Sequence, residues 1–144
     1  MAYQPANAND LKFLVRSTLL ASDAVVDVVG SRIHGAHLQA PEAGTVDYPL
    51  VVIDFTGGAV LGATGYQTIT MEVFTYSRES AGKALELYDH CFAALHQQLL
   101  RRDGVAVAGY ALEITRPEEG WNESIRAYWT VGTYTLRASY RGAS

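Results

Sequence analysis

Residues 49–77 read PLVVIDFTGGAVLGATGYQTITMEVFTYS, and residues 78–102 continue RESAGKALELYDHCFAALHQQLLRR. The near-continuous apolar run Pro49–Phe55 predicts a strand that is buried on both faces. Apolar and polar side chains alternate from Gln67 to Tyr76, which predicts a second, half-buried strand. An apolar stripe at helical spacing then predicts a long amphipathic helix from about Glu79 to Arg102. Two strands followed by a long helix indicate a sheet with one covering helix.

Shorter predicted elements flank this stretch on both sides. Asn9 or Asp10 can cap an N-terminal helix. Ser22 or Asp23 can cap a short second helix, which Gly30 would end. This short helix is predicted at Ala24–Val29, after a flexible lead over residues 1–8 and the N-terminal helix. Further strands are predicted at Arg32–Leu38, Val105–Thr115 and Ser124–Tyr140. A turn at Pro117–Gly120 is expected between the last two strands.

The order of these elements predicts the fold class. Sequential antiparallel strands with helices on one face form a two-layer α+β domain. We expect a mostly antiparallel sheet of about four to five strands, covered by the long helix and the N-terminal helix. At 144 residues the chain fits a single domain, residues 1–144, which needs neither a disulfide nor a metal ion to fold.

Composition narrows the class of function. Only 18% of the residues are charged, which is a hint that a partner covers part of the surface. The net charge of −4 argues against a protein that binds nucleic acid by neutralising phosphates, though not against one that DNA merely passes. Cys91 is the only cysteine, so an internal disulfide is excluded and a reducing compartment is the default. The polar N-terminus does not resemble a signal peptide, and no apolar run approaches the length of a bilayer span.

The residues that could carry chemistry form no catalytic pattern. His34 and His37 are three apart, but no cysteine or carboxylate nearby would complete a metal site. His90 and His96 point in different directions on the predicted helix. Cys91 lies on the apolar stripe of that helix, where a buried structural thiol is expected. No nucleophile–base pair or phosphate loop has the required spacing, so we predict neither an enzyme nor a cofactor.

Several apolar side chains lie where a partner could cover them. The Gly-rich segment Gly57–Gly65 carries Ala59, Val60 and Leu61, and its glycines predict a mobile loop that becomes ordered against a neighbour. Trp121 is expected near a hairpin tip. There it is either an interface anchor or a side chain that folds back on its own sheet.

Four segments of the chain combine element order with a few residue types at fixed places. They are Val28–Ile33, which ends in Gly-Ser-Arg-Ile, the Pro-led strand Tyr48–Ile53, the strand end Val73–Ser77, and the Ala- and Leu-rich helix Ala81–Leu100. In this order they resemble the tail terminator, or tail completion, proteins of long-tailed bacteriophages. The resemblance extends from about residue 10 to residue 140, and that family has no catalytic residues to carry over.

The resemblance implies a structural role in a virion. It implies a ring, usually a hexamer, that caps the tail tube at the neck and joins it to the head connector or stopper protein. DNA would pass through the channel, and the protein would be made in the host cytoplasm and would meet no membrane. Arg101 and Arg102 on one surface, with Glu118 and Glu119 on another, could form the polar rim of the subunit contact. The alternatives are another minor tail or head–tail joining protein, and a small α+β ligand-binding or enzymatic domain.

Overall fold

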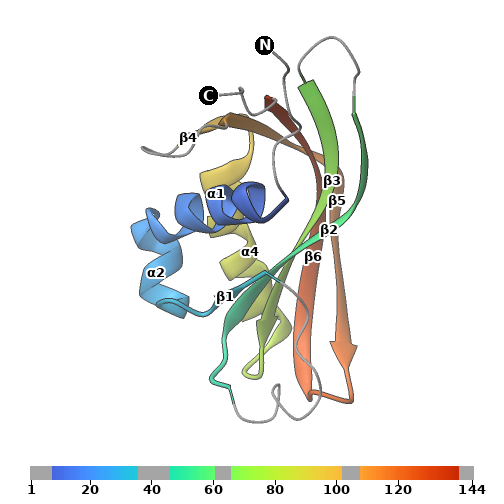
Figure 1. The fold of residues 1–144 in the computed structure, drawn as a ribbon. Coiled ribbons are helices and arrows are strands. Elements are labelled where there is room, and N and C mark those ends of the chain that lie inside the picture. Colours follow the sequence, from blue (N-terminus) through green and yellow to red (C-terminus); the bar gives the residue numbers. More distant parts are fainter. Residues whose placement is uncertain (1–7, 36–45, 61–65, 102–107, 140–144) are drawn as a thin grey trace.

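The computed structural model describes residues 8–35, 46–60, 66–101 and 108–139 (Figure 1). The helices in this part of the chain are α1 (Ala8–Leu20), α2 (Asp23–Val29) and α4 (Ala81–Leu95). The strands are β1 (Ile33–His34), β2 (Leu50–Val60), β3 (Tyr66–Ser77), β4 (Gln98–Arg101), β5 (Ala108–Asn122) and β6 (Ala127–Ser139). These elements confirm the predicted α+β class.

The strands form one six-stranded sheet in the order β1-β2-β3-β6-β5-β4, so the sheet is larger than the predicted four to five strands. Every neighbouring pair is antiparallel except β1 and β2, which are parallel. The helices lie on one face (Figure 1), and we call the other the outer face. The end of the sheet at the β5–β6 turn is called the hairpin end, and the opposite end, where β4 pairs, the β4 end.

The main core lies between the helices and the sheet. Leu14 of α1, Val73 of β3 and Leu87 of α4 are almost fully buried in it. Burying a large aliphatic side chain contributes about 1.5–3 kcal/mol, so this apolar face holds the two layers together. A hydrogen bond also fixes α4 against β3, since Thr75 Oγ1 donates to the Ala84 carbonyl at 2.7 Å.

Tyr88 of α4 reaches across the layer to the strands. Its hydroxyl donates to the Glu113 carboxylate and is hydrogen-bonded to the Tyr134 hydroxyl, 3.0 Å away. Gly132 makes room for this contact, because a Cβ at that position would collide with the Tyr88 hydroxyl. Burial, followed by these hydrogen bonds, raises the pKa of Tyr88. The phenol therefore stays protonated and anchors α4 to β5 and β6.

The long helix is shorter than the sequence predicts. α4 stops well before Arg102, because His96 has an extended conformation and Gln97 a left-handed one with φ 57°. His96 Nδ1 accepts a hydrogen bond from the Glu113 N–H at 3.1 Å, and the residues that follow pair with β5. Arg101 therefore lies in β4 and not in a helical turn. Pairing with a neighbouring strand here overrides a helical spacing of leucines.

The Gly-rich segment is also more regular than predicted. β2 does not end at Phe55 but continues to Val60, paired with β3 throughout. A bulge between Phe55 and Gly57 allows the continuation, and Gly57 has a φ of 155° that other residues rarely adopt. The glycines therefore mark a bulged strand as well as the connection that follows it.

The predicted turn at Pro117–Gly120 is part of β5 instead. Register shifts before Glu118 accommodate the proline, which sits where β4 no longer pairs with β5. The actual turn follows Asn122, whose Oδ1 accepts from the Ser124 and Ile125 N–H groups at 3.0 and 3.3 Å. A proline–glycine signal misled the prediction because bulged strands tolerate both residues.

A second buried cluster covers the outer face at the hairpin end. It consists of Leu50, Val52, Tyr76 and Ala127, with partly buried neighbours at Val46, Tyr48, Phe74, Ile125 and Trp129. The Arg78 guanidinium lies 4.1 Å from the Tyr48 ring centre and donates to the Ile125 carbonyl at 3.0 Å. Burial raises the pKa of Tyr76 to about 12. The hairpin end of the outer face is therefore closed by the chain itself.

Candidate assembly surface

Exposed apolar side chains gather on the outer face at the β4 end. Leu99 is 61% exposed, Tyr110 40%, Leu112 38% and Ile114 53%. Leu99 and Tyr110 are cross-strand partners and Leu112 lies two residues along β5, so these three share one face. Ile114 follows at a bulge. We call these four residues the β4–β5 apolar patch, and contiguous exposed patches on a domain commonly mark interaction sites.

The sequence analysis does not predict this patch, although the alternation of side chains in β5 is a signal for it. Tyr110, Leu112 and Ile114 are large and apolar at every second position, whereas Ala111 and Glu113 stand between them. Such alternation usually places the large side chains in the core. Here Ala111 is buried beneath the helices and the large side chains face outward. Periodicity thus identified two faces but not which of them is covered.

The sequence left two hypotheses for Trp121, an interface anchor or a side chain that folds back on its own sheet, and the structure has features of both. Its ring packs against Tyr128, its cross-strand partner, with ring centres 4.7 Å apart. Its Nε1 donates to the Glu123 carboxylate at 2.6 Å. The side chain is nevertheless 45% exposed at the hairpin end. It is folded onto its own hairpin and still offers an apolar surface, so its role as an interface anchor stays a prediction.

The other predicted contact residues are spread along the sheet. Glu118 and Glu119 are exposed neighbours in β5, so they point to opposite faces. Arg101 pairs with Ala108, near the start of β5, which puts it roughly 30 Å from Glu118 along the strand. Within one copy they do not meet. The backbones of Ala59 and Val60 lie in β2, whereas Leu61 and Arg102 lie outside the described residues.

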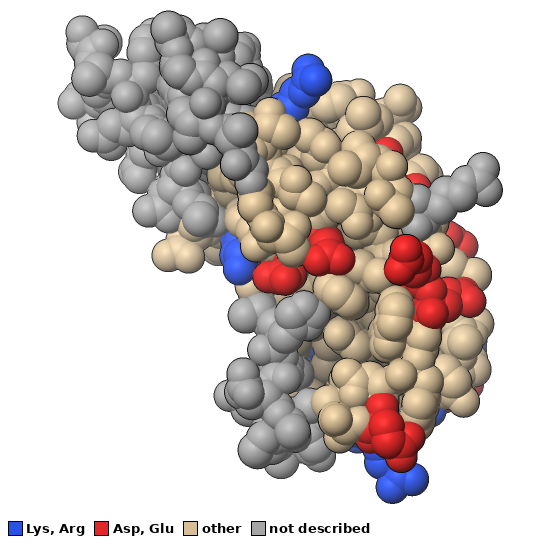
Figure 2. Space-filling view, turned by 90° about the vertical axis from the view of Figure 1, so that its right-hand side faces the viewer, with Lys and Arg blue, Asp and Glu red and all other residues tan. Residues whose placement is uncertain are grey.

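The middle of the outer face is acidic and polar. Asp54 and Glu72 are direct cross-strand partners there, in neighbouring strands β2 and β3. Figure 2 shows this side of the molecule, with acidic side chains spread over it and basic ones toward its margins. Thr133 and Thr135 of β6 are half-exposed between the acidic pair and the apolar patch. Such a face does not suit phosphate binding.

The two lateral edges of the sheet differ. At β1, alternate carbonyls point away from β2, and cations of α1 bond each of them. Arg16 donates from Nε to the Ile33 carbonyl at 2.9 Å and from Nη2 to the Ser31 carbonyl at 3.2 Å, and Lys12 donates to the Gly35 carbonyl. Cationic side chains laid along an edge strand prevent another strand from pairing there. β4 ends the sheet on the other side, whereas Lys12 and Arg16 are bonded at the β1 edge.

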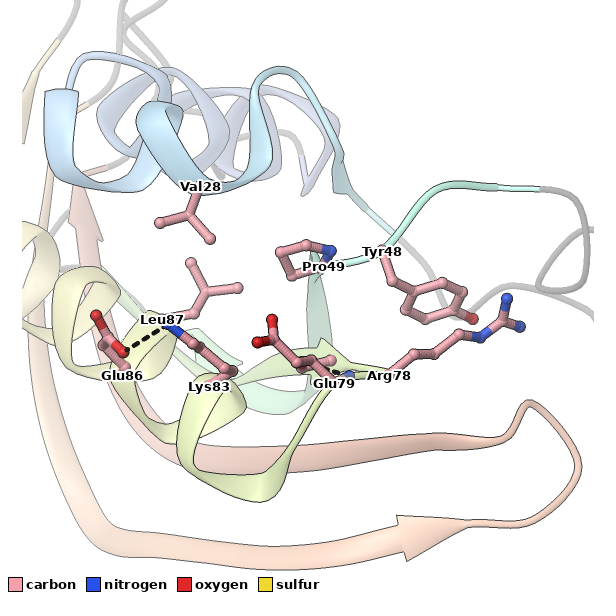
Figure 3. A pocket seen from close by; sticks show the side chains of 9 residues that line it. Val28, Tyr48, Pro49, Arg78, Glu79, Lys83, Glu86 and Leu87 are labelled. Atoms are coloured by element: carbon pink, nitrogen blue, oxygen red, sulfur yellow. Dashed lines mark hydrogen bonds and ion pairs between the residues drawn. The ribbon is translucent and has the colours of Figure 1, made fainter.

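A groove of about 530 Å³ lies on the helix side, between α2, the start of β2 and the first turn of α4 (Figure 3). Val28, Pro49 and Leu87 form its apolar part. Among its charged side chains, Lys83 lies 3.7 Å from Glu86, and both are more than half exposed. Arg78 is stacked on Tyr48. Lys83, Glu86 and Arg78 thus serve local contacts, and Glu79 is the remaining charged residue that lines the groove.

The cysteine and the described histidines considered as candidates for catalysis or metal binding lie in the core, at a helix or in a strand. Cys91 is fully buried, as predicted, and this burial raises the pKa of its thiol to about 12. His90 and His96 are partly buried, and His96 stacks on Phe92 with ring centres 4.5 Å apart. His34 lies in β1, whereas His37 falls outside the described residues. In the described ranges, no three histidine, cysteine or acidic residues group as metal ligands would.

The comparisons with known proteins identify a fold relative. No family model matches the sequence, and no curated protein matches it. A chain of the solved structure "Virion of native gene transfer agent (GTA) particle" is similar with a TM-score of 0.66 and 18% identity. The match covers 93% of this chain and 98% of that chain, so the two share their whole fold. The helices of the described segments are too short or too polar to cross a bilayer.

Proposed function

We propose that this chain is a structural virion protein of a phage or phage-like particle, acting at the neck as a tail terminator. Copies form a ring, a hexamer, that caps the tail tube and joins it to the head connector or stopper protein. DNA passes through the ring as cargo. The chain catalyses no reaction and holds no cofactor in this role.

The observation that carries the proposal is the match to a chain of a gene transfer agent virion. The match spans 93% of this chain and 98% of that one, so the similarity extends over nearly the whole of both chains and is not confined to one part of either. The sequence resemblance to tail terminators is independent of that match, because it rests on residue types in four segments. Both point to the same class of particle.

The surface agrees with an assembly part. The outer face has an apolar patch at the β4 end and acidic side chains in its middle, and the half-exposed Trp121 lies at the hairpin end on the opposite face of the sheet. Apolar side chains without cover favour protein partners. The acidic pair Asp54 and Glu72, like the net charge of −4, would repel phosphates and so keep passing DNA from adhering.

Two alternatives have some support. Another minor tail or head–tail joining protein would share the virion and differ in its place within it. A small ligand-binding or enzymatic domain is favoured only by the groove beside Leu87. Lys83 and Glu86 pair with each other and Arg78 stacks on Tyr48, so three of the four charged side chains that line the groove already have partners within the chain.

The test is native mass spectrometry of the chain over a range of concentrations, together with a binding assay on purified tail tubes that lack a terminator. We expect a closed oligomer of about six copies, in solution or on the tube end. Replacing His34, His37, His90 and Cys91 one at a time should leave this assembly largely intact, apart from a stability loss at Cys91. A chain that stays monomeric and ignores tube ends contradicts the proposal and favours the small-domain alternative.

A further inference from the structure

The two edges of the sheet give a basis for predicting how copies meet. A head-to-tail ring joins two different surfaces of each subunit. On one side of the sheet, Arg16 and Lys12 close β1. β1 covers only Val51 and Val52 of β2, so among the described residues the part of β2 from Asp54 to Val60 pairs with β3 on one side and with no strand on the other. On the other side, β4 is the last strand.

These two open edges lie at the same height of the sheet. The cross-strand partners form a continuous row from Ala59 of β2 through Thr68, Arg137 and Tyr110 to Leu99 of β4. Successive antiparallel pairings make β2 and β4 run in the same direction. A rotation about an axis along the strands would therefore bring β4 of one copy beside β2 of the next, in parallel and without a vertical offset.

We propose that β4 of one copy adds as a neighbour to the Asp54–Val60 part of β2 in a second copy, and that the β4–β5 apolar patch packs against that copy. This inference rests on the proposed function, since it takes a second copy of this chain as the partner. Main-chain hydrogen bonds would supply the pairing, as in other cases of strand addition to an open edge. Leu99, 61% exposed, would be covered by it.

Disulfide trapping tests the pairing directly in the full-length chain. Ala59→Cys combined with Leu99→Cys places thiols in one row, and native Cys91 is buried and gives no background. We expect mild oxidation to give a ladder of covalent oligomers up to the closed ring. Ala59→Cys with Arg101→Cys covers a register shifted by two residues. Phe13→Cys with Leu99→Cys is the control pair and should give no ladder.

A charge substitution gives a second, non-covalent readout. Leu99→Lys alters an exposed side chain, so circular dichroism should be unchanged while the concentration needed for assembly rises at least tenfold. Phe13→Lys, at a position 44% exposed on α1, is the matched control and should assemble like the unaltered chain.

The outcomes separate this inference from the proposed function. Rings that form without a ladder in either cysteine pair, or that tolerate Leu99→Lys, overturn the edge pairing alone. Covalent dimers from Leu99→Cys by itself indicate β4–β4 pairing and also overturn it. A chain that neither oligomerises nor binds tube ends overturns both.

Discussion

The two faces of the sheet differ in whether their side chains have partners within the same copy. On the helix side, Tyr88, Glu113 and Tyr134 form a hydrogen-bonded set among buried aliphatic residues. On the outer face at the β4 end, Leu99, Tyr110 and Leu112 are exposed, and acidic residues lie nearby. The helix-side contacts account for folding. The outer contacts contribute little to one copy, which is why we assign them to assembly.

This difference predicts that substitutions on the two faces separate stability from assembly. Helix-side changes should lower the free energy of unfolding and leave the assembly of the surviving folded protein unchanged. Changes to the exposed side chains at the β4 end of the outer face should weaken assembly and leave the free energy of unfolding nearly unchanged.

The largest effect is expected at Gly132. Gly132→Ala puts a Cβ against the hydroxyl of Tyr88, which is buried and held by two hydrogen bonds. Overpacking of this kind costs about 2–3 kcal/mol of unfolding free energy. Urea unfolding measures it. Gly82→Ala is the matched control, since its added Cβ meets only Ser80 Oγ at 3.8 Å in the first turn of α4, and it should not destabilise.

Tyr88→Phe should lower the free energy of unfolding by about 1–3 kcal/mol, because Glu113 and Tyr134 lose a buried partner. It also removes the hydroxyl oxygen, the closest of the three Tyr88 atoms that a Cβ at Gly132 would strike, while two ring carbons remain. The double variant should therefore be less destabilised than the sum of the two single ones. Strict additivity in urea unfolding would show that the two residues do not meet as described.

Alkaline pH should weaken the fold through Cys91. The folded pKa is raised from 9.0 to about 12, so the unfolded thiol loses its proton first. The stabilising effect is complete below pH 9 and is lost as the pH rises toward 12, with a slope of about 1.4 kcal/mol per pH unit for one proton. Cys91→Ala should show a shallower decline between pH 9 and 11, measured by urea unfolding at each pH. An unchanged slope would mean that the thiol is accessible in the fold.

Trp121→Ala tests the hairpin end. It should weaken assembly or tube binding by more than about 1 kcal/mol if the exposed ring is an anchor, and the fold by less, since 45% of the side chain is already exposed. Glu118→Ala, at an exposed position in the same strand, should change assembly by less than about 0.5 kcal/mol. Equal effects of the two substitutions on native mass spectra would remove Trp121 from the interface.

The sequence predicted local elements better than their pairing. The alternation from Gln67 to Tyr76 and the Ser22 cap were read correctly, because side-chain periodicity and capping act within a few residues. The predicted end of α4 is wrong, because the helix end depends on pairing with β5 and on the His96–Glu113 hydrogen bond, whose two residues are far apart in the sequence. The proline of β5 was read as a turn for the same reason.

The candidate surface was harder to predict than the fold. Trp121 stood out as a large aromatic beside polar residues, and the structure leaves it half-exposed. The β4–β5 apolar patch was not predicted, since alternation alone does not say which face the helices cover. The closure of β1 depends on Lys12 and Arg16, two helical cations that the sequence shows only as part of a polar face.

Amide hydrogen exchange, measured on the free chain and on the chain assembled on tail tubes, tests the division between the two faces most directly. We predict that assembly slows exchange in β4, in residues 54–60 of β2 and around Leu112. We predict no change in the interior of α4 around Tyr88, which is already protected by folding. Equal protection of β4 and β2 in both states, or new protection confined to the helices, would contradict the assignment of the outer face and its open edges to assembly.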